Sequence, residues 1–546
     1  MRIPPFPGHR APPLAQGAAG QPAGAGLGAA LAAARVGGAF WGAQPALAEG
    51  TLVLAPSSPA QLAQMLAEAP AGQPLALLGA GALVGKAPAS AQRLPAECDP
   101  WWLAEQAAAV WAGADRELAL VAALAGTPLR LFGAGAFAGV DQGPQALAAA
   151  VSAEVGALAY RCPYTGAPLD AAAAVALMAP WRALIDANRR LGCVLGAARW
   201  KRVTLDALLW DGSGPVRHAR RLPAAMAPGQ VVLAWKSRSA PALLAEAAAR
   251  GLAVAELEDG FIRSVGLGAD CVPPLSVVVD FGGIYFDPAT PSDLESLLAG
   301  GDPRLDDPAL LARAAALRAA LVAGAISKYG PGATGAAPAC APTPGRRRVL
   351  VTGQVEDDRS VLSGGALRSN LALLQAARAA EPDAHILYRP HPDVEAGHRK
   401  GHIPEPQVLA LANEICREGP ITALIDSVEA LHVITSLAGF EALLRGKQVS
   451  VHGAPFYAGW GLTRDLAPLP PRRGRAHSLD ALVAAALLVY PRYLDPVSRL
   501  PCPAEILVQR LASNTAGVRS ALVKLRQWQG KARLLVRAAA SGWRGG

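Results

Sequence analysis

The sequence lacks the features that mark several familiar classes of protein. Its seven cysteines are scattered and never form Cys-x-x-Cys, which argues against a disulfide framework and against a cysteine-rich zinc site. No uncharged apolar run reaches the roughly 20 residues that span a bilayer. Prolines stand in the N-terminal stretch MRIPPFPGHRAPP, where a secretion signal needs an apolar helix. We therefore expect a cytoplasmic protein that does not cross the membrane.

Acidic residues are absent from residues 506–546, whereas eight basic residues lie there. The apolar residues between Val518 and Leu535 fall at helical spacing, and the basic residues occupy the other faces. This pattern predicts a basic amphipathic helix suited to the anionic surface of the inner membrane, with an ordinary surface helix or a disordered basic tail as the alternative. Elsewhere basic and aromatic residues are not interleaved across a folded face, so we expect no nucleic-acid partner.

The distribution of strand-like and helical runs predicts the domain organisation. Residues 1–50 are rich in Ala, Gly and Pro and lack periodicity, so we expect them to be largely disordered. Further along, short apolar strands alternate with Ala- and Leu-rich helices, which predicts parallel sheets covered by helices. We place two doubly wound, Rossmann-type α/β domains at 191–330 and 348–505, joined by a Pro-rich linker at 331–347. The cleft between such domains, at the carboxyl ends of the strands, is where ligands bind.

An internal repeat suggests that part of this architecture occurs twice. Residues 126–139 align with 446–459 at a constant offset of 320 and share the glycines around a strand. The polar residues of the later copy are replaced in the earlier one: Thr435 by Asp115, Ser436 by Arg116 and Glu441 by Val121. We therefore expect residues 51–190 to be a shortened, degenerate α/β copy without an active site of its own.

Three polar clusters follow strand-like runs: EDGFIRS (258–264), YRPHP (388–392) and TSLAGFE (435–441). Each alone has an ordinary explanation, namely a capping turn, a stiffened loop with a surface histidine, or a plain helix cap. A histidine between two prolines sits on a rigid backbone, and the free N–H groups that open a helix suit a phosphate or a ribose hydroxyl. No Gly-x-x-x-x-Gly-Lys-Ser/Thr loop occurs, which excludes a P-loop enzyme. Together the clusters predict one ligand site at the strand ends of two domains.

Longer strings carry a resemblance to a known family. EDGFIRSVGLG, PPLSVVVDFGGIYFDPATPSDLESLL, RPHPDVEAGHRKGH and TSLAGFEALLRGK resemble the KpsC-type capsule polysaccharide proteins, over about residues 190 to 505. Members of that family are retaining β-Kdo transferases that build a Kdo linker on a phosphatidylglycerol-type lipid. The resemblance implies a GT-B-like fold, CMP-Kdo as donor, a lipid-linked acceptor and no cofactor or metal. It also implies a peripheral place at the inner membrane, near capsule synthesis and export proteins.

The resemblance assigns the reacting groups to the EDG cluster. Retention by double displacement needs a carboxylate nucleophile. We expect Asp259 to react and Glu258 to assist or to be structural. Adjacent strand residues point to opposite faces, so both carboxylates face the donor only if the turn begins there.

The remaining roles concern the donor. His391 is expected at the phosphate, and Thr435 and Ser436 open a helix that would hold the phosphate or the ribose. Glu441 would accept ribose hydroxyls. The carboxylate of the sugar would pair with one of two cations: Arg263 or Lys236.

Two other classes of function stay open. A non-catalytic capsule assembly or scaffold protein is disfavoured over residues 190–505 by the intact clusters, but not over residues 50–190. A transferase that uses another CMP-sugar, such as sialic acid, is disfavoured by the long match around FGGIYFDPATPSDLE.

Overall fold

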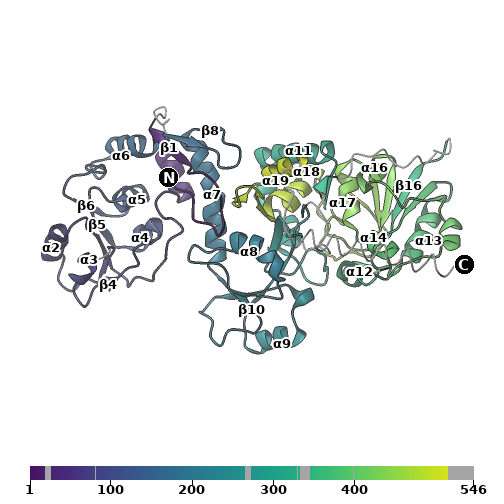
Figure 1. Ribbon diagram of the computed structural model, residues 1–546, viewed down its shortest axis with the longest axis horizontal. Helices are drawn as coiled ribbons and strands as arrows, with labels where there is room; N and C mark the ends of the chain where they lie inside the picture. Colours follow the sequence, from purple (N-terminus) through teal and green to yellow (C-terminus); the bar gives the residue numbers. More distant parts are fainter. Residues whose placement is uncertain are drawn as a thin grey trace, which may run out of the picture. The chain divides into compact units, whose positions relative to one another are not determined.

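The computed structural model describes residues 1–18, 26–79, 82–264, 272–328, 330–331, 345–397 and 399–513. The chain forms two compact units (Figure 1). Unit 1 comprises Met1–Leu191, Leu205–Arg217 and Ser498–Leu500, and unit 2 comprises Gly192–Thr204, His218–Val497 and Pro501–Gly546. Among the described residues, every helix is too short or too polar to cross a membrane.

Unit 1 is built on a five-stranded parallel sheet in the order β4-β3-β2-β5-β6. Its strands are β2 (Leu52–Ala55), β3 (Leu75–Leu77), β4 (Gln92–Arg93), β5 (Ala109–Gly113) and β6 (Leu129–Phe132). Its helices are α2 (Pro59–Glu68), α3 (Ala82–Gly85), α4 (Pro100–Gln106), α5 (Glu117–Ala125) and α6 (Pro144–Val151). The chain builds one side outward from β2 and the other side from β5, so these two strands form a topological switch point.

The N-terminal segment is packed rather than disordered, which corrects the expectation for residues 1–50. In its described part, β1 (Ala15–Ala18) joins β7 (Leu158–Arg161) and β8 (Pro168–Leu169) in a small sheet, and α1 (Leu27–Ala34) forms. Phe6 is buried and meets Trp181 of α7 (Ala171–Asn188) edge to face. The Ala- and Gly-rich composition hid this because a few large aromatic side chains supply much of the buried area.

Unit 2 begins with a seven-stranded sheet in the order β10-β9-β11-β12-β13-β22-β23. The strands are β9 (Leu191–Leu195), β10 (His218–Ala219), β11 (Val231–Ala234), β12 (Val254–Asp259), β13 (Ser276–Asp280), β22 (Arg492–Leu494) and β23 (Pro501–Cys502). Parallel sheets were expected, and β12 does run parallel to β11, but the pairs β12–β13, β13–β22 and β22–β23 are antiparallel. The reason is local: the Gly260 N–H already donates to the Ser276 carbonyl, so the chain folds back beside β12 instead of crossing over.

A second sheet of unit 2 has six strands, all parallel, in the order β18-β17-β16-β19-β20-β21. Its strands are β16 (Arg348–Thr352), β17 (His385–Arg389), β18 (Glu414–Ile415), β19 (Ala430–Val433), β20 (Gln448–Val451) and β21 (Arg464–Asp465). The strands read as near-continuous apolar runs because helices cover both faces. The switch point lies between β16 and β19.

Helices complete unit 2. They are α9 (Pro241–Ala249), α10 (Asp293–Ala299), α11 (Pro308–Ala323), α12 (Arg359–Gly364), α13 (Asn370–Ala380), α14 (Pro392–Glu395), α15 (Glu405–Leu409), α16 (Ile421–Asp426), α17 (Leu437–Leu444), α18 (Leu479–Val483) and α19 (Ala504–Ala512). A ribbon β14 (Ile326–Ser327)–β15 (Gly330–Pro331) follows α11, and α8 (Arg202–Leu208) lies where the chain passes between the units. One hydrophobic cluster joins the two sheets, with Phe261 stacked on Phe456 at 4.4 Å.

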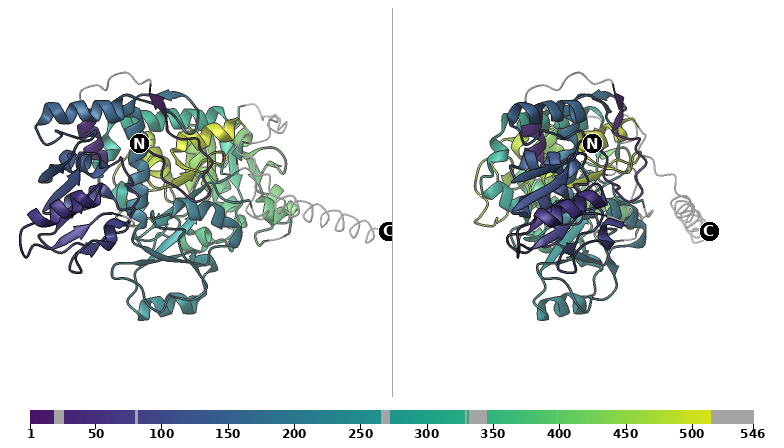
Figure 2. Two further views of the ribbon diagram at one scale, coloured as in Figure 1. Left: turned by 60° about the vertical axis from the view of Figure 1, so that its left-hand side comes forward. Right: turned by 90° about the vertical axis from the view of Figure 1, so that its left-hand side faces the viewer.

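The end of the described chain returns to the first sheet. β22 pairs with β13, so the predicted boundary of a domain at 348–505 does not hold beyond about residue 490. α19, at the yellow end of the described chain in Figures 1 and 2, lies beside α11 in Figure 1, and Arg313 of α11 pairs with Glu505 at 2.9 Å. Most of the linker predicted at 331–347 and the basic helix predicted after residue 513 lie outside the described residues.

The parallel sheets of the two units share one strand order. β2, β3, β4, β5 and β6 take the places of β16, β17, β18, β19 and β20. In each unit a π-helical turn then leads into an antiparallel hairpin, β7–β8 or β22–β23. The Tyr160 hydroxyl donates to the Val155 carbonyl at 2.7 Å, and the Tyr493 hydroxyl donates to that of Leu487 at 2.8 Å. The hairpins lie where the sequence already pairs residues 160–166 with 493–499, and the shared strand order extends the correspondence upstream to β2 and β16.

Candidate functional site

A cavity of about 750 Å³ opens in unit 2 at the switch point of the six-stranded sheet. One wall comes from the seven-stranded sheet and its loops: Glu258, Phe261, Tyr285 and Phe286. The other wall follows the carboxyl ends of β16, β17 and β19 and includes Gln354, His391, Thr435, Ser436 and Glu441. Five of the eight residues predicted from the sequence therefore meet at one cavity. Asp259, Arg263 and Lys236 are not on its wall.

The two carboxylates of the EDG cluster point to opposite sides because β12 continues through Asp259. Glu258 faces the cavity, and its Oε1 accepts the Asp259 N–H at 3.0 Å. Asp259 faces away, where Oδ1 lies 3.0 Å from Lys201 Nζ and Oδ2 lies 2.8 Å from Arg263 Nε. The glycine that follows is required because a side chain at Gly260 would collide with Ser276.

The environment separates the acidities of these two groups. Burial, followed by the charge of Asp259, raises the pKa of Glu258 to about 7. Burial alone would also raise the pKa of Asp259, but attraction to Lys201 and Arg263 outweighs it and holds that pKa below its ordinary value. Lys201 is buried itself and lies 3.2 Å from the centre of the Trp235 ring. Near neutral pH, Asp259 is thus a permanent anion, whereas Glu258 exchanges a proton.

The cation predicted at Lys236 is bound to a carboxylate that sequence reasoning overlooked. Glu256, two residues before Glu258 on the same strand face, is only 2% exposed, and its Oε2 lies 2.7 Å from Lys236 Nζ. Its other oxygen accepts a hydrogen bond from Arg359 Nη1 at 3.1 Å. Arg359 belongs to the six-stranded half of unit 2 and lines the cavity. The Glu256 carboxylate therefore gathers two cations at the edge of the site.

The switch point is bridged by a side-chain amide. Gln354 Oε1 accepts the Thr435 N–H at 2.8 Å, and Gln354 Nε2 donates to Thr435 Oγ1 at 3.1 Å. The buried Asn370 holds Gln354 in turn, because its Oδ1 accepts the Gln354 N–H at 2.8 Å. Thr352, at the end of β16, has a buried hydroxyl on the cavity wall without a hydrogen-bond partner among the described residues. That hydroxyl is available to a ligand.

Ser436 opens α17 as the sequence indicated. Its Oγ caps the helix by accepting the Ala438 N–H at 3.2 Å, and its carbonyl accepts the Tyr457 hydroxyl at 2.5 Å. A side chain at Gly439 would collide with Tyr457, which explains the glycine in TSLAGFE. The eight-residue helix directs its N-terminal dipole at the cavity, where it favours an anion.

His391 is held in one tautomer by the short helix that it begins. Its Nδ1 accepts the Asp393 N–H at 3.2 Å, so the neutral ring carries its proton on Nε2. Burial lowers the pKa of His391, which keeps the ring neutral at pH 7. The residue is therefore a hydrogen-bond donor rather than a cation.

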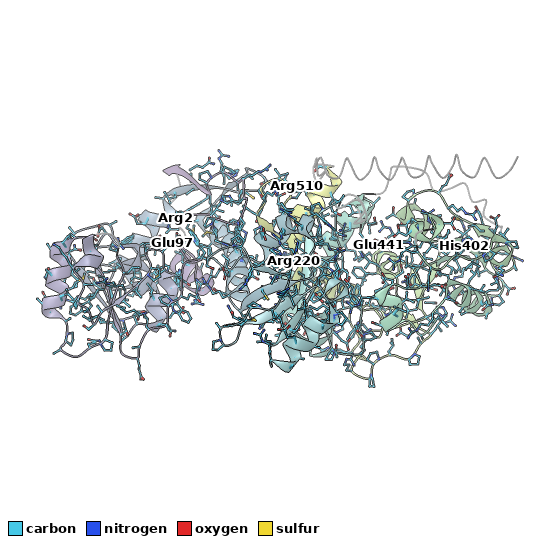
Figure 3. All side chains as sticks on the ribbon, turned by 60° about the horizontal axis from the view of Figure 1, so that its bottom comes forward. Arg2, Glu97, Arg220, His402, Glu441 and Arg510 are labelled. Carbon is cyan, nitrogen blue, oxygen red and sulfur yellow. The ribbon has the colours of Figure 1, made fainter. Side chains whose placement is uncertain are left out.

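Glu441 lies one turn into α17 and is 8% exposed; Figure 3 labels it on this green part of the ribbon. Its Oε1 accepts the N–H of Lys328 at 3.0 Å, and burial raises the pKa of its carboxyl. Lys328 lines the cavity, and its positive charge acts on Glu258, His391 and Glu441 alike. It is the central cation of the site.

Several residues of this cavity wall were not predicted from the sequence. Lys328 lies in SKYG, and Gln354 and Arg359 lie in GQVEDDRS, two strings for which no role was predicted. Arg389 was passed over as part of the YRPHP cluster, and it donates to three backbone carbonyls of the loop Cys416–Gly419 at 2.7–3.0 Å. A polar residue within two positions of a strand end was the signal that would have found most of them.

The equivalent place in unit 1 is occupied by the unit's own side chains. Ser57, after β2, donates from its hydroxyl to Asp115, after β5, which bridges that switch point as Gln354 and Thr435 bridge the other. Gln61 fills the space between, accepting from the Ser57 N–H at 2.8 Å and donating to the Phe132 carbonyl at 3.2 Å. A carboxylate at this position repels phosphate. Among the described residues of the whole chain, no group of three or more His, Cys, Asp or Glu side chains is placed to hold a metal ion.

Comparison with known proteins gives a consistent result. The family model for capsule polysaccharide biosynthesis proteins matches residues 230–493. The capsule polysaccharide modification protein LipA of Neisseria meningitidis serogroup A is 43% identical over 281 residues, which are 51% of this chain and 39% of that protein. The lipopolysaccharide-processing protein LpsZ of Rhizobium meliloti is 46% identical over 265 residues, which are 48% of this chain and 59% of that protein. The chain thus spans less than two thirds of either relative.

A solved structure is similar over nearly its whole length. It is Thermosulfurimonas dismutans KpsC, beta Kdo 2,4 transferase, with 32% sequence identity and a TM-score of 0.50. The similar region covers 59% of this chain and 98% of that one.

Proposed function

The chain belongs to the capsule polysaccharide biosynthesis protein family, and on that premise we propose that it is a glycosyltransferase that transfers β-Kdo from CMP-Kdo to a lipid-linked, phosphatidylglycerol-type acceptor during synthesis of the capsule linker. One observation carries the proposal. Glu258, a carboxylate with a pKa of about 7, faces a histidine donor, a lysine and a helix N-terminus across a single cavity. This arrangement suits a sugar with an anionic leaving group.

The phosphate-binding half of the site is assigned to the six-stranded sheet. The leaving phosphate would accept hydrogen bonds from His391 Nε2 and from the first N–H groups of α17, with Lys328 supplying the positive charge. Glu441, placed one turn further along α17, would accept the ribose hydroxyls. These groups stabilise the charge that develops on CMP as it departs.

The reacting carboxylate is assigned to Glu258 instead of Asp259. Both oxygens of Asp259 are held by cations away from the cavity, whereas Glu258 lies on its wall. In the first step Glu258 Oε would attack the anomeric carbon while the bond from that carbon to the phosphate oxygen breaks, and the electron pair leaves with CMP. In the second step the oxygen of an acceptor hydroxyl would attack the anomeric carbon, the bond to Glu258 Oε would break, and the hydroxyl proton would pass to the released Glu258 carboxylate, so two inversions give retention.

The finer features of the molecule are proposals of the same kind. The two sheets of unit 2 and the cavity at their junction suit a GT-B-like arrangement. The shared strand order, π-helical turn and hairpin support a shortened, degenerate copy in unit 1. A place at the inner-membrane surface and contacts with capsule synthesis and export proteins rest on the lipid-linked acceptor. Liposome flotation with and without residues 515–546 tests the membrane part.

The test is an assay of purified full-length protein with each CMP-sugar and a lipid-linked acceptor. We expect transfer from CMP-Kdo and none from CMP-sialic acid, with a β-configured product identified by nuclear magnetic resonance. Transfer from CMP-sialic acid alone would replace the donor in the proposal. Absence of both transfer and donor hydrolysis would favour a scaffold protein.

A further inference from the structure

We infer that Arg359 is the specificity-determining residue that pairs with the carboxylate of the donor sugar. The inference rests on the proposed function and explains how the site would distinguish an acidic sugar from a neutral one. It also moves this role away from Arg263 and Lys236, because neither of those two side chains lines the cavity, whereas Arg359 does.

The position of Arg359 is the first argument. Ser360, its neighbour, places its Oγ 3.4 Å from Thr435 Oγ1, at the phosphate-binding end of the cavity. Arg359 itself reaches Glu256 at 3.1 Å. Glu256 stands two residues from Glu258 on the same strand face, which is about 7 Å along a strand. Arg359 therefore spans the gap between the phosphate site and the reacting carboxylate, where the sugar has to lie.

The charge and shape of this corner are the second argument. One buried carboxylate, Glu256, faces two cations, so the group of three retains one positive charge. Arg359 is the member of that group that lines the cavity, and its side chain is 36% exposed. Its guanidinium carbon lies 5.0 Å from the centre of the Phe286 ring, which orients the planar group. A planar guanidinium binds a carboxylate through two parallel hydrogen bonds.

The other cations on the described cavity wall make contacts of a different kind. Arg389 donates to three backbone carbonyls. Arg399 pairs with Asp357 at 3.1 Å, with both side chains largely exposed to solvent. Lys328 is assigned to the phosphate, because its backbone N–H binds Glu441 of α17 and its charge acts on His391. Arg359 is thus the residue best placed to meet the sugar.

The experiment compares Arg359→Gln with the wild-type full chain in one assay. It measures the KM for CMP-Kdo and the inhibition constant of CMP. Because a charge-assisted contact to the sugar alone is lost, we expect KM to rise roughly tenfold or more and the CMP constant to stay within about twofold. Arg359→Lys keeps the positive charge but not the planar guanidinium, so its KM should lie between those of the wild type and Arg359→Gln. Arg304→Gln, which breaks an exposed ion pair with Asp302 that is not on the cavity wall, is the control and should change neither constant.

A second variant separates sugar recognition from a simple latch between the two halves of unit 2. Glu256→Gln removes the carboxylate that competes for Arg359, so KM should stay level or fall. If Arg359 only holds the two halves of unit 2 together through Glu256, both variants would raise the KM and the inhibition constant of CMP together. That result would overturn the inference. An unchanged KM in a folded Arg359→Gln protein would overturn it as well, while leaving the proposed function intact. A wild-type chain inactive on CMP-Kdo would overturn both.

Discussion

At the scale of single residues, two adjacent carboxylates differ in orientation and in charge state. The regular alternation of β12 directs Glu258 into the cavity and Asp259 toward Lys201 and Arg263. Ion pairing keeps Asp259 charged, and burial beside that charge raises the pKa of Glu258 to about 7. A pair of groups with separated pKa values is how one site provides two roles.

The raised pKa of Glu258 predicts the pH dependence of the reaction. A nucleophile has to be ionised, so kcat/KM for CMP-Kdo should rise with pH, about tenfold per unit below pH 7, and level off above it. Glu258→Gln should be folded but inactive. Glu246→Gln, on the exposed side of α9, is the control and should keep the wild-type profile. A flat profile, or an active Glu258→Gln protein, would contradict the assignment.

Asp259 is predicted to act through its charge. Asp259→Asn leaves Lys201 and Arg263 without their anion, and breaking such a buried pair should destabilise the protein by about 3 kcal/mol. Because the charge of Asp259 helps to raise the pKa of Glu258, the variant's pH profile should shift to lower pH while some transfer persists. Urea unfolding and the pH profile measure the two effects. Complete loss of transfer in a folded variant would return the nucleophile to Asp259, as the sequence alone suggested.

At the scale of elements, one βαβ unit occurs in two versions. In β19–α17–β20 the helix opens with a capping serine and carries Glu441, whereas in β5–α5–β6 the corresponding positions are Arg116 and Val121. The backbone geometry is kept, while the capping hydroxyl and the carboxylate are lost. The same βαβ fold can therefore form with or without the polar side chains of the proposed site.

This comparison predicts where CMP binds. Glu441→Val copies the unit 1 residue and removes the proposed ribose acceptor, so CMP affinity should fall about tenfold or more. Asp115→Asn alters the exposed unit 1 position that corresponds to Thr435 and should leave CMP affinity unchanged. Calorimetry with CMP on the full chain gives both values and the stoichiometry, which should be one. Two equivalents of CMP per chain would show that unit 1 also binds nucleotide.

At the scale of the whole molecule, buried ion pairs join the two halves of unit 2. Arg473, 7% exposed, donates through Nη2 to Glu295 at 2.9 Å and through Nη1 to the Pro455 carbonyl at 2.6 Å. Glu295 belongs to α10, beside the seven-stranded sheet, whereas Pro455 belongs to the loop after β20. This pair fixes the loop that presents Phe456 to the cavity.

Arg473→Met is accordingly predicted to be strongly destabilising. It removes the buried one of the two arginines that pair with Glu295, Arg472 being the other, and it removes a donor to the Pro455 carbonyl, at a cost of about 3 kcal/mol. Arg417→Met breaks two solvent-exposed ion pairs, with Glu395 and Glu405, and should cost less than about 1 kcal/mol. Urea denaturation of both variants measures the difference. Equal stabilities would mean that the two halves are held together by the hydrophobic cluster alone.

The sequence by itself determined the α/β character of the chain and much of the site. His391, Thr435, Ser436 and Glu441 were predicted to share one ligand site, and they line one cavity, because polar residues that follow apolar strands lie at the edge of a sheet where ligands bind. Local patterns of this kind depend on neighbours along the chain, and those are visible in the sequence.

Only the tertiary structure decided which side chains complete the cavity. Whether Glu258 or Asp259 faces inward depends on strand register, and one residue of slip reverses it. Arg359 reaches Glu256, 103 residues earlier in the chain, and Lys328 reaches Glu441, 113 residues later. The packing of Phe6 and the antiparallel β13 were likewise hidden. Contacts between distant segments follow from how whole elements pack, and no local pattern encodes them.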